Sequence, residues 1–89
     1  PMNTLESVFD VIRDLILELK DDEIGPITLD STIESLDLDS LDFVEMQVVA
    51  RKKLNVVMDP AAFASRDIST LRALCEYILE LGRDTDTPA

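Results

Sequence analysis

The apolar residues near the start of this 89-residue chain recur at helical spacing. They stand three or four positions apart, which places them on one face of an α-helix. The set is Leu5, Val8, Phe9, Ile12, Leu15, Ile16 and Leu19. The spacing predicts an amphipathic helix from Thr4 to Lys20, with Asn3 and Glu6 as a capping pair. Because such a helix must bury its apolar face, the rest of the chain has to supply a core.

A second main helix is predicted from Ser40 to Lys53, after a long loop at residues 27–39. The loop shows no sustained period, and its aliphatic side chains alternate with polar ones. We expect the aliphatic side chains to hold the loop against the core. One helical turn is expected at residues 30–34, with Asp30 or Ser31 as its cap. Ordered loops of this length are uncommon in compact domains and are often functional.

The C-terminal part of the chain predicts a short helix and a last main helix. Residues 54–58 are apolar and are expected to form a partly buried connector. Asp59 and the proline after it are typical of a helix start, which predicts a short third helix at residues 61–63. Ser69 is expected to cap the last helix, and Gly82 is placed to end it. The apolar residues of this helix stand at core spacing and are Leu71, Leu74, Cys75, Ile78 and Leu81.

Together these elements predict an all-α fold, a four-helix bundle with three main helices and a short third helix. The length of the chain allows one domain, with room for a modest hydrophobic core. We expect this domain to span residues 2–82. Residues 83–89 are polar and contain a proline, so we expect them to form a flexible tail.

Acidic residues greatly outnumber basic ones in this sequence. The chain has 19 Asp and Glu against 8 Lys and Arg, which gives a formal net charge of −11 at pH 7. Such an excess repels nucleic-acid phosphates and anionic membrane surfaces, so we expect neither kind of binding. It favours basic protein partners, although a small protein also gains solubility from charge of this size.

The cysteine content and the apolar runs bear on where the protein works. Cys75 is the only cysteine, so no internal disulfide can form, which favours a reducing compartment. On the core face of the last helix, we expect it to be an inert thiol. No apolar run reaches the ~18 residues of a membrane-spanning helix, and charged residues interrupt the N-terminal apolar ones, unlike a signal peptide. We therefore expect a cytoplasmic protein that is a monomer on its own.

Two apolar stripes lie on nearly opposite sides of the predicted second helix. Phe43, Met46 and Ala50 form one stripe, and Leu41, Val44 and Val48 form the other. An ordinary surface helix buries a single stripe. We expect the first stripe to lie in the core and the second to lie near solvent, edged by Asp42 and Glu45. For Leu41, a place in the core remains the alternative.

Ser40 stands at the predicted start of this helix, between Asp39 and Asp42. One interpretation is that it only caps the helix, as many serines do. Three observations favour a modified serine instead. Acids flank it on both sides, the exposed stripe begins immediately after it, and a helix N-terminus accommodates a phosphate.

The acidic residues around Ser40 do not fit a calcium-binding loop. Counting from Asp37, the sixth position holds Asp42 where glycine is needed, and the twelfth holds Val48 where a bidentate Glu belongs. We therefore expect no metal site. The chain also contains no histidine, so no serine–histidine pair can form and we expect no catalytic residues.

The segment Asp39-Ser40-Leu41-Asp42, with Leu36 before it and Val44-Glu45 after it, resembles the attachment site of an acyl carrier protein. The order of the predicted helices is similar over nearly the whole chain. The resemblance implies an acyl-carrier-protein-like bundle in which Ser40 carries 4′-phosphopantetheine. A phosphopantetheinyl transferase would install this group covalently from coenzyme A. An acyl chain would then be carried as a thioester on the arm.

The resemblance also implies that the chain delivers acyl intermediates to a ketosynthase and other acyl-processing enzymes of fatty-acid or polyketide type. Acidic groups would meet basic side chains of these partners, and the exposed stripe would fill an apolar patch on them. The implied partner-binding residues are Asp39, Leu41, Asp42, Val44, Glu45 and Val48, with Arg51 and Lys52 further along.

One departure from the family is the basic run Arg51-Lys52-Lys53, where members commonly continue the acidic strip. This run implies a set of partners unlike that of housekeeping fatty-acid synthesis. The alternative function is an acidic helical protein–protein interaction domain that docks through the exposed stripe without any prosthetic group. The sequence leaves open which acyl group and which pathway are involved.

Overall fold

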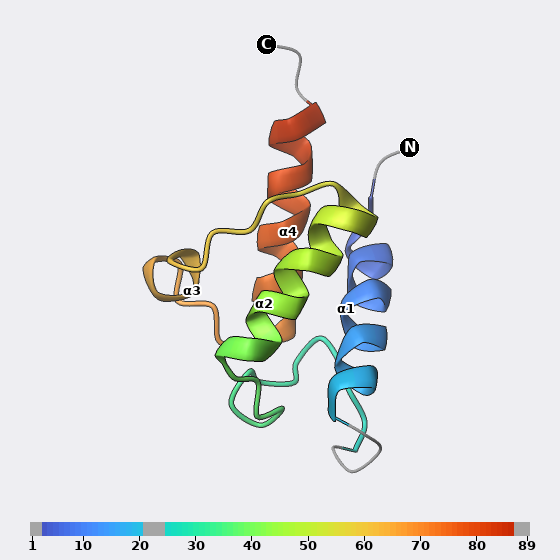
Figure 1. Cartoon of the computed structure of the whole chain (residues 1–89), viewed down its shortest axis with the longest axis vertical. Helices are drawn as coiled ribbons and strands as arrows, with labels where there is room; N and C mark the ends of the chain where they lie inside the picture. Colours follow the sequence, from blue (N-terminus) through green and yellow to red (C-terminus); the bar gives the residue numbers. More distant parts are fainter. Residues whose placement is uncertain (1–2, 21–24, 87–89) are drawn as a thin grey trace.

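The computed structural model describes residues 3–20 and 25–86, and every regular element in these ranges is helical. The elements are α1 (Leu5–Lys20), α2 (Ser40–Val49), η2 (Ala50–Leu54), α3 (Ala62–Ser65) and α4 (Leu71–Asp86). Both α2 and α4 pack against α1, and the short α3 lies on the other side of α2 from α1 (Figure 1). The predicted all-α bundle, with three main helices and a short third helix, is therefore confirmed.

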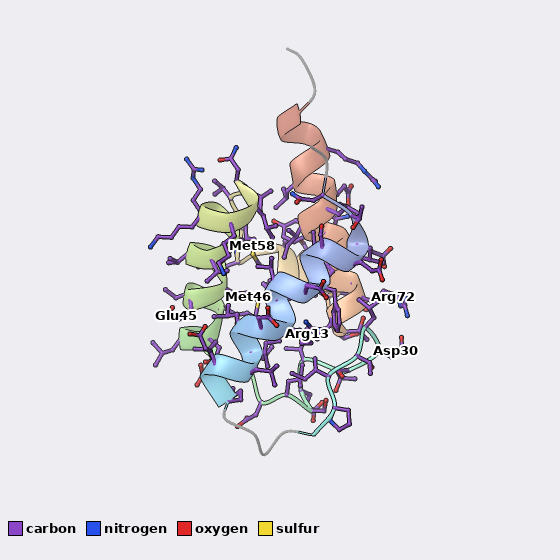
Figure 2. The ribbon with its side chains drawn as sticks, turned by 90° about the vertical axis from the view of Figure 1, so that its right-hand side faces the viewer. Arg13, Asp30, Glu45, Met46, Met58 and Arg72 are labelled. Atoms are coloured by element: carbon purple, nitrogen blue, oxygen red, sulfur yellow. The ribbon has the colours of Figure 1, made fainter. Side chains whose placement is uncertain are left out.

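The core forms where the apolar faces of the main helices meet. Helix α1 contributes the apolar face that its spacing predicted. Helix α4 contributes apolar residues at the predicted spacing. Fully or almost fully buried side chains include Val8, Ile12, Ile16, Met46, Ala50, Leu71, Leu74, Cys75 and Ile78. Figure 2 shows Met46 and Met58 lying between α2 and α1. These buried faces determine how the three long helices pack, because burying the apolar side of each helix lowers the free energy of the folded chain.

Helix α1 begins one residue later than predicted and uses a different cap. The Thr4 amide donates to Ser7 Oγ at 2.9 Å, and the Ser7 amide donates to Thr4 Oγ1 at 3.1 Å. This reciprocal pair is a capping box, so the prediction of Asn3 and Glu6 was wrong. Thr4 and Ser7 have the same three-residue spacing as Asn3 and Glu6, one position further along the chain. Their short hydroxyl side chains form the capping box.

The long loop before α2 is held against the start of α4 by backbone hydrogen bonds. The Leu71 amide donates to the Ser31 carbonyl at 2.9 Å, and the Arg72 amide donates to the Leu29 carbonyl at 2.8 Å. In the other direction, the Ile33 amide donates to the Ser69 carbonyl at 2.9 Å. The loop therefore satisfies amides of the first turn of α4, which have no partner within the helix.

The helical turn in this loop lies further along the chain than predicted. It occupies residues 33–37 rather than 30–34, and the Leu36 amide donates to the Thr32 carbonyl at 3.2 Å. Thr32 Oγ1 accepts from the Ser35 amide at 3.0 Å, so Thr32 is the cap in place of Asp30 or Ser31. Leu36 is buried, which confirms that an aliphatic side chain holds the loop to the core.

The second helix has nearly the predicted length but changes its hydrogen-bond pattern. The π-helical turn η2 continues α2 to Leu54, and Asn55 ends it in the left-handed region at φ 57°. In the connector that follows, Val56 and Met58 are buried and Val57 is exposed, as a partly buried segment requires. The predicted short helix is present but lies slightly further along, at Ala62–Ser65 rather than residues 61–63. Asp59 Oδ1 accepts from the Ala61 amide at 3.0 Å in the turn that leads into it.

Two predictions about α4 were wrong. Thr70 caps it, because Thr70 Oγ1 accepts from the Ala73 amide at 3.1 Å, and Ser69 does not. The helix also runs through Gly82 to Asp86, so residues 83–86 of the expected tail are helical. Gly82 does not have the positive φ of a helix-ending glycine. The domain boundaries at residues 2 and 82 stay predictions.

We predict that Gly82→Ala stabilises the protein. Alanine favours a helix over glycine by about 0.5–1 kcal/mol, and the added Cβ would lie 3.8 Å from Val56 Cγ1, an ordinary contact. The free energy of unfolding in urea measures the effect. Gly25→Ala is the contrasting variant, because Gly25 has φ +70° and should cost about 1 kcal/mol when replaced. Destabilisation by both changes would contradict the helical role of Gly82.

Candidate functional site

Ser40 is the first residue of α2, and it is exposed. The residue before it, Asp39, is the helix cap. Asp39 Oδ1 accepts from the Asp42 amide at 2.9 Å, and the Asp39 amide donates to Asp42 Oδ2 at 3.1 Å. These two bonds form a capping box on either side of Ser40. The interpretation that Ser40 itself caps the helix is therefore wrong.

The Ser40 hydroxyl is not used in capping the helix. Within the described residues, no hydrogen bond to this hydroxyl is found. Its backbone position at the helix start is one where the helix dipole favours a negatively charged group. An exposed hydroxyl at a positive helix end is accessible for attachment of a phosphate.

Asp42 lies inside the bundle, contrary to our expectation. Only 8 % of the residue is exposed, and Lys20 Nζ lies 2.7 Å from its Oδ2 atom. The capping box turns this carboxylate back toward the helix start, where the lysine at the end of α1 reaches it. Asp42 therefore does not edge the exposed stripe. Sequence patterns gave no signal for Lys20, because the contact joins two helices across the long loop.

The ion pair alters the acidity of both of its members. The hydrogen bond from Lys20 lowers the pKa of Asp42 below its ordinary value of 3.8, although desolvation opposes this effect. The hydrogen bond to Asp42 raises the pKa of Lys20 above 10.5, and the negative charges of Asp39 and Asp37 add to the rise. Lys20 is thus the positive charge that faces the acidic residues around the helix start.

The second apolar stripe of α2 faces solvent, as predicted. The exposed fractions are 75 % for Leu41, 52 % for Val44 and 43 % for Val48. The alternative of a core position for Leu41 is therefore wrong. Glu45 is exposed and points away from the bundle on the outer side of α2 (Figure 2). Apolar and acidic side chains thus share one accessible face that begins next to Ser40.

The basic run lies on η2, at the far end of the same continuous helix. Arg51, Lys52 and Lys53 are all exposed. Arg51 Nη1 donates to Oδ1 of Asn55, the residue that ends the π-helical turn. The helix that begins at Ser40 therefore has acidic groups near its start and basic groups at its end.

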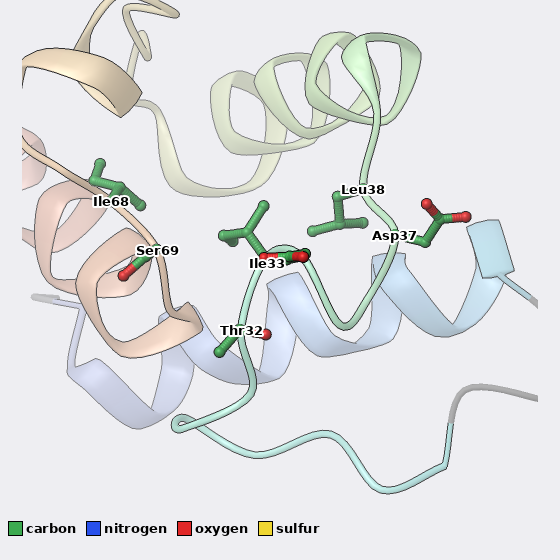
Figure 3. Close-up of a pocket in the computed structure, with 7 residues that line it drawn as sticks. Thr32, Ile33, Asp37, Leu38, Ile68 and Ser69 are labelled. Atoms are coloured by element: carbon green, nitrogen blue, oxygen red, sulfur yellow. The ribbon is translucent and has the colours of Figure 1, made fainter.

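A pocket of about 500 Å³ lies between the long loop and the segment before α4. Figure 3 shows Ile33 between Leu38 on one side and Ile68 on the other. The remaining lining residues are Thr32, Glu34, Asp37 and Ser69. Sequence reasoning missed this pocket because its walls come from two segments that are far apart in the chain. Only the packed loop brings them together.

The remaining chemically distinctive side chain, Cys75, is fully buried. Burial raises the pKa of its thiol to about 12, and the nearby charge of Glu76 adds to the rise. The thiol therefore stays protonated at neutral pH, and a thiolate is needed for reactivity. In the described part of the chain, no group of three or more potential ligand side chains is arranged to hold a metal ion.

Comparisons with known proteins gave one result. A family model described as a phosphopantetheine attachment site matches residues 10–78, well over half of the chain. The matched segment includes Ser40, the exposed stripe and the ion pair. No curated protein and no solved structure matched the chain. None of the helices in residues 3–20 and 25–86 is long and apolar enough to cross a membrane.

We predict that the Lys20–Asp42 pair persists from below pH 3.8 to above pH 10.5. The folded pKa of Asp42 is depressed, so its stabilising contribution is present above 3.8 and is lost as the pH falls through the folded value. The folded pKa of Lys20 is raised, so its contribution is lost only above 10.5. An NMR titration of the Asp42 carboxyl carbon should give a midpoint below 3.8.

In the same titration, Lys20→Met should move the Asp42 midpoint upward, because the buried carboxylate loses its cation. Arg13→Met is the matched control, since it removes one charge from the exposed side of the same helix. It should leave the midpoint unchanged. Equal midpoints in the Lys20→Met variant and the unaltered protein would contradict the ion pair.

Proposed function

Because this chain belongs to the phosphopantetheine attachment site family, it is a non-enzymatic carrier of covalent 4′-phosphopantetheine, and we propose that Ser40 is the attachment residue. One observation carries this assignment. The Ser40 hydroxyl stands exposed at the first residue of α2, while Asp39 performs the capping that would otherwise occupy it. When bound, the group supplies a terminal thiol on which an acyl chain is carried as a thioester.

In the attachment reaction, this chain supplies the acceptor oxygen, and the transferase supplies the catalytic groups. Ser40 Oγ becomes an ester oxygen of the phosphodiester, and the adenosine bisphosphate part of coenzyme A leaves. The hydroxyl proton passes to a base that the transferase supplies, since this chain has no histidine and the Asp39 and Asp42 carboxylates beside Ser40 accept the capping hydrogen bonds. The N-terminus of α2 favours the negative charge of the attached phosphate.

The face that begins at Ser40 is the surface that we propose for enzyme docking. Leu41, Val44 and Val48 present apolar side chains there, and Asp39 and Glu45 present exposed carboxylates. Asp42 is left out of this surface because its carboxylate is buried against Lys20. Small apolar contacts and exposed charges bind weakly and release quickly, which suits a carrier that visits several enzymes.

The basic end of the same helix adds a second requirement for the partner. Arg51, Lys52 and Lys53 are exposed on η2 and would favour acidic groups on a docked enzyme. An enzyme that fits this face has basic groups near Ser40, an apolar patch beside them and acidic groups at the far end. This pattern supports partners distinct from those of a carrier with a uniformly acidic helix.

The chain delivers its cargo to several classes of enzyme. The chain receives its arm from a phosphopantetheinyl transferase and carries acyl intermediates to a ketosynthase and other acyl-processing enzymes of fatty-acid or polyketide type. We further propose that it works in the cytoplasm and is a monomer on its own. The net charge of −11 supports the monomeric state, because like charges disfavour self-association.

We predict that incubation with coenzyme A, Mg²⁺ and a broad-specificity phosphopantetheinyl transferase adds the mass of phosphopantetheine to the chain. Ser40→Ala should abolish the gain, because the acceptor oxygen is removed. Ser65→Ala is the matched control, since Ser65 is also an exposed helical serine, and it should be modified normally. Intact-protein mass spectrometry measures all three. A chain that gains no mass would instead be the acidic interaction domain without a prosthetic group.

We also predict that changing Arg51, Lys52 and Lys53 together to Glu weakens binding to a ketosynthase that accepts this carrier. The dissociation constant should rise roughly tenfold, because like charges facing one another across an interface are strongly unfavourable. The rate of modification by a promiscuous transferase should change much less. Titration calorimetry at low and moderate salt measures the effect, which salt should reduce.

The control for the basic run is the same reversal at Arg13, Arg66 and Arg72, which changes the net charge equally on other faces. These arginines form surface ion pairs, and such pairs contribute little to stability. Their reversal should leave ketosynthase binding nearly unchanged. If the two triple variants bind alike, the basic run is ordinary solvated surface.

A further inference from the structure

One ion pair in the described residues differs from the others by its burial. The side chains of Lys20 and Asp42 are 17 % and 11 % exposed, and their charged atoms lie 2.7 Å apart. The other ion pairs of the described chain join side chains that are 37–82 % exposed. Exposed pairs are largely screened by water, whereas a shielded pair holds its members in one geometry.

The shielded pair is connected directly to the residues that flank Ser40. Oδ2 of Asp42, which contacts Lys20 Nζ, also accepts the Asp39 amide at 3.1 Å. The Asp42 amide in turn donates to Asp39 Oδ1 at 2.9 Å. One carboxylate therefore joins the end of α1 to the capping box of α2.

We propose that Lys20 is a positioning residue for the modification of Ser40. By holding Asp42, it fixes the capping box and so presents the Ser40 hydroxyl to the transferase in one orientation. Ser40 lies between the two residues of the box, so a shift of either one moves its backbone. This inference rests on the proposed function of Ser40, and Lys20 acts through Asp42 rather than on the hydroxyl itself.

Lys20 also balances negative charge around Ser40. The attachment adds a phosphate to a segment that already contains Asp37, Asp39 and Asp42. Lys20 is the cation whose pKa responds to all three of these acids. Without it, Asp42 would be a shielded carboxylate with no countercharge, which is costly and favours displacement toward water. The capping box would then loosen at the moment when more negative charge arrives.

The test compares transferase kcat/KM on apo variants that circular dichroism shows to be folded at the assay temperature. Lys20→Met should lower kcat/KM about tenfold, since misplacing a reacting group by a remote change can cost on the order of 100-fold. Lys20→Arg keeps the charge and should restore most of the rate. Arg13→Met removes one charge from the same helix and should stay within about twofold of the unaltered protein.

A second variant keeps the test decisive if Lys20→Met does not fold. Asp42→Asn retains an oxygen for the Asp39 amide but loses the charge that Lys20 binds, so it should lower kcat/KM severalfold. The double variant should be no slower than Lys20→Met alone, because both changes break the same link. Slower amide exchange at Asp39 and Asp42 in the unaltered protein than in either single variant would support the positioning role independently.

The outcomes separate this inference from the function on which it rests. If the unaltered chain is modified at Ser40 and folded Lys20→Met and Asp42→Asn react at the same rate, Lys20 has no positioning role. The inference is also overturned if the losses in kcat/KM caused by Lys20→Met and by Asp42→Asn multiply in the variant that carries both changes. If the unaltered chain is not modified at Ser40 at all, the proposed attachment site itself fails.

Discussion

Only one of the two apolar sides of α2 can be buried in a bundle of this size. Met46 of α2 and Ala50 at the start of η2 are both fully buried in the core, and Leu41 and Val44 are left exposed to solvent. Packing against α1 decides which side is turned inward, because the buried face of α1 meets that side of α2. The exposed stripe is thus a consequence of core formation. It leaves an exposed apolar surface beside Ser40, which is the surface that we propose for enzyme docking.

Electrostatics then place a constraint on the start of α2. A chain with a net charge of −11 concentrates Asp37, Asp39 and Asp42 around one serine, where like charges repel. The carboxylates of Asp39 and Asp42 accept the capping hydrogen bonds, and Lys20 neutralises the buried one, Asp42. The serine between them takes part in neither arrangement. This separation suits the role that we propose for Ser40, because an attachment residue has to stay accessible while the helix behind it stays capped.

Much of the fold followed from local patterns in the sequence. Helical spacing predicted α1, α2 and the apolar spacing of α4, because residues three and four apart share a face in any helix. Caps were less predictable, since Thr4 and Thr70 compete with equally suitable neighbours and the winner depends on how the chain enters the helix. Gly82 was misjudged for a related reason. A glycine ends a helix only where the backbone turns left-handed, and Gly82 lies inside α4 without a positive φ.

For the site, sequence patterns were enough to single out Ser40, the neighbouring Asp39 and the apolar stripe beyond it, because these residues follow one another closely along the chain. The tertiary structure alone decided that Asp42 is buried and that Lys20 meets it. It also decided that two distant segments enclose the pocket beside Ile33. The reason is physical: spacing along a chain fixes which side chains share a helix face, whereas contact between helices depends on how those faces pack.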